Sequence, residues 1–134
     1  MRAILIDPMF KKLQEVEYSG NYKDIYKLIG YDDIIMNDRV LMKGYRPTAF
    51  DVVRIPIGFD GIYVDDEGLY APLQFRWSFQ YGAVHEPIRL CNKALVLGCD
   101  DNGNSIEPDS TLDDMRAMIT WDWKSEKQEV YQTA

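Results

Sequence analysis

The stretch QFRWSFQY, at residues 74–81, is the part of this chain that most clearly indicates its fold class. Phe75, Trp77, Phe79 and Tyr81 alternate with polar residues, and this two-residue period is typical of a β-strand with one face in a core. We expect the aromatic face to be buried and the polar face to lie toward solvent.

Two wholly apolar runs accompany this strand, AILI at residues 3–6 and ALVL at residues 94–97. A short strand without a polar face is typical of a position that is buried on both sides. Pro8 cannot donate to a strand ladder, so it ends the first run, which we expect to be a central strand. Together with residues 75–81, the two runs predict one mainly antiparallel sheet.

Two segments have the period of amphipathic helices. In residues 22–29 the apolar positions fall at helical spacing, with Asn21 as the expected N-cap and Gly30 as a left-handed C-terminal residue. The second helix begins at Ser110 and Thr111, where a hydroxyl is followed by acidic residues that complement the helix dipole. A final strand is expected at residues 119–123, after this helix.

These elements predict an α+β fold, with a mainly antiparallel sheet and about two helices packed on it. The chain has 134 residues, which is the usual length of one domain and is enough to close one hydrophobic core. We expect a single domain over residues 1–123 and a polar C-terminal tail over residues 124–134.

Two further segments bear on possible functional sites. Residues 31–48 have an irregular pattern, which fits either a hairpin or an irregular excursion. Residues 61–70 predict a tight hairpin, in which Asp65, Asp66, Glu67 and Gly68 form the turn.

The charge of the chain is uneven. The formal net charge is −7; residues 1–48 carry 8 Lys and Arg against 7 Asp and Glu, a net of +1, and residues 49–134 carry 7 against 15, a net of −8. A negative surface repels phosphates, so we expect no direct binding to nucleic acid or to an anionic membrane. The acidity fits a basic protein partner, or serves solubility alone.

Several phrases in fixed order carry a resemblance to a known family. They are RAILIDP, EVEYSGNY, GNYKDIYKLIG, YVDDEGL, ALVLGCDDNG and STLDDMRAMITW, between residues 2 and 121. Together they closely resemble a family of small uncharacterised proteins, a domain of unknown function, from tailed bacteriophages and prophages. The chain departs from the family pattern in residues 31–48, which are longer. The resemblance implies a phage origin and a place in the cytoplasm of an infected bacterium, and it assigns no catalytic residue.

Two acidic segments are the first places to look for a metal. Asp60 lies near Asp65, Asp66 and Glu67, and converging carboxylates suit Mg²⁺ or Mn²⁺. Adjacent strand residues point to opposite faces, however, and turns favour Asp and Gly for backbone reasons, so we favour an architectural turn. The loop at residues 100–105 lacks the glycine and the glutamate of a calcium loop, and we expect a polar hairpin loop there. We therefore expect no metal and no other cofactor.

No catalytic motif stands out. His85 is the only histidine, which excludes a zinc helix with two histidines. Cys91 and Cys99 are the only cysteines, and without an export signal we expect free thiols. A nucleophilic pair of either cysteine with His85 has no third group to orient it. The apolar runs are far shorter than the roughly 20 residues that cross a bilayer, so we expect a soluble protein. The N-terminal MRAILIDP is too short for the core of a signal peptide, so we expect the protein in the cytoplasm.

These observations favour a non-enzymatic phage accessory protein that binds and modulates a host protein during infection, in host takeover or counter-defence. A narrower version is an acidic mimic of nucleic acid. The alternative is a small-ligand-binding or nucleotide-binding domain, or an enzyme, with a site between Asp60 and Gly68. The residues expected to contact a partner are Asp100, Asp101, Asp109, Asp113, Asp114, Tyr31 and Tyr45.

Overall fold

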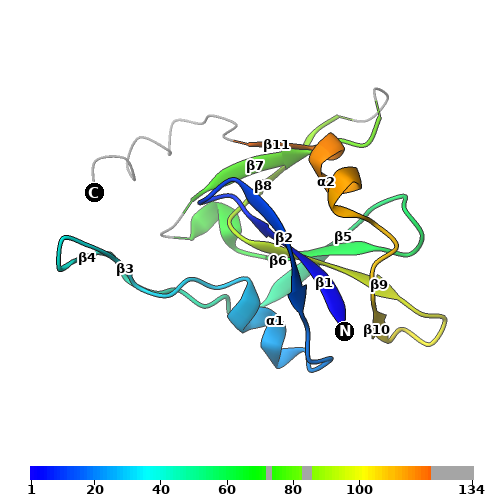
Figure 1. Cartoon of the computed structure of the whole chain (residues 1–134), viewed down its shortest axis with the longest axis horizontal. Helices are drawn as coiled ribbons and strands as arrows, with labels where there is room; N and C mark the ends of the chain where they lie inside the picture. The colour runs from blue at the N-terminus through cyan, green and yellow to red at the C-terminus, as the bar shows by residue number, and fades with distance from the viewer. Residues whose placement is uncertain (72–73, 83–85, 122–134) are drawn as a thin grey trace.

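The computed structural model describes residues 1–71, 74–82 and 86–121, and it shows an α+β fold with mostly antiparallel sheets (Figure 1). This confirms the predicted fold class. None of the helices in the described part of the chain has the length and the apolar character needed to cross a membrane. The predicted tail at residues 124–134 lies outside the described residues.

The larger sheet has the order β2-β1-β9-β6-β5, and every neighbouring pair is antiparallel. The predicted apolar runs are β1 and β9, which lie side by side in the middle of the sheet, as expected for the first run. Short β10 (Ser105–Ile106) extends the sheet beside β9. The strands of the main path are β1 Arg2–Asp7, β2 Lys12–Glu17, β5 Phe50–Arg54, β6 Gly61–Asp65 and β9 Ala94–Cys99.

A second, three-stranded sheet contains the strand predicted at residues 74–81. Its order is β11-β7-β8, with β7 at Arg76–Phe79, β8 at Ile88–Cys91 and β11 at Ile119–Trp121. The prediction that β1, β7 and β9 share one sheet is therefore wrong. β7 instead faces the larger sheet across the core, because Trp77 and Phe79 pack against residues of β1, β6 and β9.

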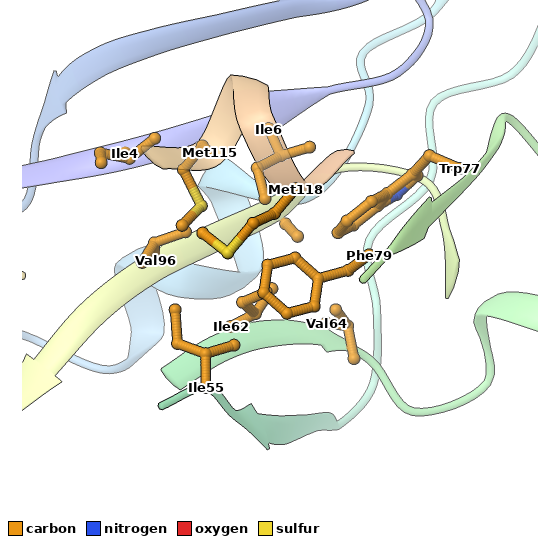
Figure 2. Packing of buried hydrophobic residues seen from close by; sticks show 11 residues of the cluster. Ile4, Ile6, Ile55, Ile62, Val64, Trp77, Phe79, Val96, Met115 and Met118 are labelled. Atoms are coloured by element: carbon orange, nitrogen blue, oxygen red, sulfur yellow. The ribbon is translucent and has the colours of Figure 1, made fainter. Parts of the chain in front are cut away.

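The main core lies between the two sheets and is closed by helix α2 (Leu112–Met118). Figure 2 shows Met115 and Met118 of this helix among side chains from both sheets. The helix begins with a capping box, in which the Thr111 hydroxyl accepts a hydrogen bond from Asp114 N and the Asp114 carboxylate accepts one from Thr111 N. The predicted start of the second helix is confirmed.

The opposite face of the larger sheet is covered by helix α1 (Lys23–Leu28), through Ile25 and Ile29. β1 and β9 are thus buried on both faces, as their sequences predict. The predicted N-cap Asn21 is wrong: the N-cap of α1 is Tyr22, whose side chain makes no capping hydrogen bond, and Asn21 Oδ1 instead accepts a local hydrogen bond from Lys23 N at 3.0 Å. Gly30 was predicted to have a left-handed backbone, but its φ is not positive. Glycine is needed there because a side chain would collide with Arg46 and the Tyr45 carbonyl.

The polar face of β7 is also buried, which corrects the expectation of a half-buried strand. Gln74, Arg76 and Ser78 all lie in the interior, whereas the aromatic Tyr81 is exposed. The Arg76 guanidinium donates a hydrogen bond to the Gln74 side chain. Gln74 and Arg76 are therefore hydrogen-bond partners inside the protein, which lowers the cost of burying them.

Residues 34–42 form a hairpin that projects from the layered body (Figure 1), so the hairpin reading of residues 31–48 is confirmed. Its strands are β3 (Ile34–Met36) and β4 (Arg39–Met42), and we name this hairpin the arm. Asn37 and Asp38 have φ of 53° and 62°, the backbone of a tight hairpin turn with two central residues.

The hairpin predicted for residues 61–70 is absent. β6 pairs with β5 and β9, and after Asp65 the chain enters a 3₁₀ helix, η1, at Gly68–Tyr70. Asp65 Oδ1 accepts a hydrogen bond from Glu67 N at 3.0 Å, which is the local turn behaviour of an aspartate. The turn residues therefore steer the chain away from the sheet.

Candidate interaction surfaces

Asp60 holds the segment before α2 against the larger sheet. Its side chain is buried and accepts hydrogen bonds from Asp109 N at 3.0 Å, from Ser110 N at 2.7 Å and from the Ser110 hydroxyl. A Cβ atom at Gly98 would lie 2.7 Å from the Glu107 carbonyl oxygen and 3.3 Å from Asp60 Oδ1, so position 98 has no room for a side chain. Asp60 is thus a structural anchor, and its oxygens are directed at the protein backbone.

Three of the five predicted partner-binding aspartates gather near this anchor. Asp100 and Asp101 line a surface hollow of about 440 Å³ together with Gly58 and Phe59. The Asp109 carboxylate lies against Gly58, where any side chain would collide with it. Arg54 also lines the hollow, and the Phe59 side chain is 71% exposed. We name this region, formed by Gly58, Phe59, Asp100, Asp101 and Asp109, the acidic end.

Asp100 is held in one orientation by its own loop. Its Oδ1 atom accepts hydrogen bonds from Asn104 N at 2.8 Å and from Asn102 N at 2.9 Å. These bonds, the one from Asn104 first, lower the pKa of Asp100, so its negative charge persists at neutral pH. Within the part of the chain that the structure describes, no group of three or more His, Cys, Asp or Glu side chains has the arrangement of a metal site.

Asp113 and Asp114 lie on the first turn of α2 and are engaged locally. Asp114 belongs to the capping box, and Asp113 forms an ion pair of 2.7 Å with Arg116 on the next turn. The structure therefore gives them a role in starting the helix, whereas Asp100, Asp101 and Asp109 have neighbouring positions on the surface.

Of the two tyrosines predicted to contact a partner, Tyr45 is half-buried and Tyr31 is buried. Tyr31 is only 2% exposed, so its ring offers no surface to a partner. The two residues form an isolated antiparallel bridge at the base of the arm, and the Tyr45 hydroxyl donates to Asp65 Oδ2 at 2.7 Å. Burial, and then the negative charge of Asp7, raise the pKa of Tyr31. Both tyrosines tie the arm to the body.

Further polar contacts fix the base of the arm. Arg46 donates to the Tyr31 carbonyl at 2.7 Å and to Asp32 Oδ1 at 2.9 Å, and Gly44 N donates to the Asp33 carboxylate. Beyond this base, the side chains of Ile35 and Val40 are 62% and 50% exposed. The arm is therefore anchored at one end and exposes apolar side chains beyond it.

The sequence did not reveal a buried polar group behind β7. Asn92, with φ of 69°, accepts a hydrogen bond from Phe75 N at its Oδ1 atom and one from Trp77 Nε1 at its carbonyl, both at 2.9 Å. Cys91 is buried beside Arg76; burial raises the pKa of the thiol, and the guanidinium opposes this shift. A neutral buried thiol is a poor nucleophile, so we assign Asn92, Cys91 and Arg76 a structural role. His85 lies outside the described residues.

The sequence also did not predict a second hollow, of about 500 Å³. It runs between the end of β5 on one side and the end of β7 and the start of β8 on the other, and we name it the edge groove. β5 and β8 are each the outermost strand of their sheet. No local pattern predicts it, because its two walls come from different sheets. The groove is lined by Arg54, Ile55, Pro56, Phe79, Tyr81, Glu86 and Ile88.

Comparison with models of known protein families, with curated proteins and with solved structures finds no match to this chain. The resemblance to a phage protein family stays a prediction from the sequence.

Proposed function

We propose that this protein is a non-enzymatic binding protein that contacts a basic protein partner through its acidic end. The observation that carries the proposal is one surface region in which Asp100 and Asp101 line a hollow with the exposed Phe59, and the Asp109 carboxylate lies against the neighbouring Gly58. Together with the family resemblance, it supports a phage accessory protein whose partner is a protein of the infected bacterium.

The chemistry of the acidic end suits this role. Three carboxylates on one surface attract a positively charged partner over several ångströms and raise the rate of encounter. An exposed aromatic ring among them supplies the apolar contact on which binding energy in interfaces commonly rests. If the partner surface normally binds nucleic acid, the carboxylates take the place of phosphates, which is the acidic-mimic version of the proposal.

We propose no small-ligand, nucleotide or metal site between Asp60 and Gly68. Asp60 and Asp65 each accept hydrogen bonds from other parts of the chain. They lie at the two ends of β6, about 16 Å apart along an extended strand, so their carboxylates do not converge.

The test starts from partners captured by the full chain in bacterial lysate and identified, followed by binding kinetics with the purified partner. The double variant Asp101→Asn/Asp109→Asn is expected to lower the association rate about tenfold at low salt. Raising the ionic strength should slow association of the unmodified protein as well. The matched control is Asp51→Asn/Asp66→Asn, which removes two exposed charges elsewhere and should have a smaller effect.

Two outcomes would contradict the proposal. One is a complex whose association rate ignores both salt and the acidic-end substitutions. The other is binding to free duplex DNA at micromolar or lower dissociation constants in physiological salt, which a chain of net charge −7 should not show.

A further inference from the structure

The arm exposes an apolar face that the rest of the described chain does not cover. Ile35 and Val40 are cross-strand partners, so their side chains lie on the same face of the arm. β3 and β4 pack mainly on each other, and in Figure 1 they point away from the layered body. A two-stranded ribbon of this kind is only marginally stable in water, and a second surface over its apolar face stabilises it.

The edge groove offers such a surface. Its walls include Ile55, Phe79 and Ile88, and it lies where both sheets end, so a projecting hairpin can enter it from outside. Tyr81 and Ile88 are each 40% exposed. The same chain thus carries an apolar projection and an apolar hollow of about 500 Å³, each without a cover in the described residues.

Charges on the two surfaces complement each other. Asp38 and Arg39 follow each other at the tip of the arm, next to Val40. Arg54 lies on the β5 wall of the edge groove, and Glu86 lies on the β8 wall. Seating the arm in the groove therefore allows Asp38 to approach Arg54 while Arg39 approaches Glu86, and the apolar face between them is removed from water.

We propose that the arm of one copy of this protein docks in the edge groove of a second copy. The contact is between two different surfaces, so it produces either a closed pair with both arms exchanged or a ring or chain of copies. Residues 31–48, which contain the arm, would then serve self-association. This inference does not rest on the proposed function, although Arg54 lines both the edge groove and the hollow of the acidic end.

The first experiment measures the mass of the full chain by sedimentation as its concentration is raised. We expect self-association, and we expect Ile35→Asp/Val40→Asp in the arm to raise the dissociation constant at least about 30-fold. Tyr81→Asp/Ile88→Asp in the groove should do the same. The matched control is Val52→Asp, which places a charge at an exposed apolar position of β5 outside the groove and should leave association unchanged.

Mixing supplies a test that misfolding cannot imitate. The arm variant retains its groove and the groove variant retains its arm, so the two variants together should form a one-to-one complex although neither associates alone. Circular dichroism and thermal unfolding of each variant check that it folds. A charge exchange tests whether Arg39 of one copy lies beside Glu86 of the other. Arg39→Glu and Glu86→Arg should each weaken association, and mixing these two variants should recover it.

The inference is overturned by a chain that stays monomeric up to about 1 mM. It is equally overturned if association survives either double variant, or if folded arm and groove variants fail to bind each other when mixed.

Discussion

The body and the arm use similar residues with opposite results. Ile62 in β6 and Ile35 in β3 are both isoleucines in antiparallel strands, yet Ile62 is fully buried and Ile35 is 62% exposed. Ile62 is covered because β7 and α2 pack over the face of the sheet on which it lies (Figure 2). An apolar strand therefore becomes part of a core only when another layer covers it.

The two regions are also held by different forces. The body depends on apolar side chains packed between layers, whereas the base of the arm depends on the Tyr31–Tyr45 bridge and on the hydrogen bonds of Arg46. Hydrogen bonds between partly exposed groups add little net stability, because water competes for the same atoms. The arm should therefore contribute much less than the body to the free energy of unfolding.

The strongest test of this comparison substitutes the same residue type in both regions. Ile62→Ala should lower the free energy of unfolding by about 4 kcal/mol, because it leaves a cavity in a packed core. Ile35→Ala should change it by less than about 0.5 kcal/mol, because the side chain is already in water. Urea unfolding at low protein concentration measures both. Equal effects would mean that the arm is packed as the body is.

A second test concerns the anchor that joins β6 to α2. Asp60→Ala should cost about 3 kcal/mol in urea unfolding, because Ser110 and the Asp109 backbone amide lose a buried acceptor. The control Asp101→Ala removes an exposed aspartate of the acidic end and should cost less than about 0.5 kcal/mol. A mild effect of Asp60→Ala would show that water readily replaces the carboxylate.

Asn92 tests the polar group behind β7. Asn92→Ala should cost about 2 kcal/mol, because alanine at φ of 69° is strained and Phe75 N loses its acceptor. Asn92→Gly removes the same hydrogen bond without the strain, so it should cost about 1 kcal/mol. If both variants unfold at the same urea concentration, the backbone conformation contributes nothing measurable.

The smallest expected effect is a pH dependence from Cys91. Because burial raises the pKa of this thiol in the folded state, the unfolded chain releases its proton first as the pH rises. The stabilising contribution is complete below the unfolded value of about 8.5 and is lost as the pH rises through the folded value. Between pH 8 and 9.5, the stability of the Cys91→Ala variant should therefore fall less steeply with rising pH than that of the unmodified protein. An unchanged dependence of stability on pH would contradict a raised pKa of Cys91 in the folded state.

Some elements were predictable because their causes are local. The capping box of α2 lies within four residues, 111–114, and the apolar runs of β1 and β9 contain no residue that needs a polar side. The turn of the arm also follows from Asn37 and Asp38, which tolerate positive φ. In each case the sequence pattern and the tertiary structure favour the same conformation.

Other elements were predicted wrongly because residues far away in the chain decide them. The polar face of β7 is buried although its alternation predicts exposure. Tyr31 flanks a polar stretch, yet the body and the arm base enclose it. The anchoring role of Asp60 was not predicted, because its donor Ser110 lies 50 positions later in the chain.

Local sequence patterns were sufficient to predict the fold class, the central strands β1 and β9, the start of α2 and the acidic charge of the second part of the chain. These depend on residue type and short-range spacing. The tertiary structure was needed to see that β7 belongs to a second sheet, that Asp100 and Asp101 share a hollow with Phe59, and that the described residues leave the arm and the edge groove uncovered. The physical reason is that a surface is made by segments distant in sequence, whose meeting depends on how complete layers pack and not on any local pattern.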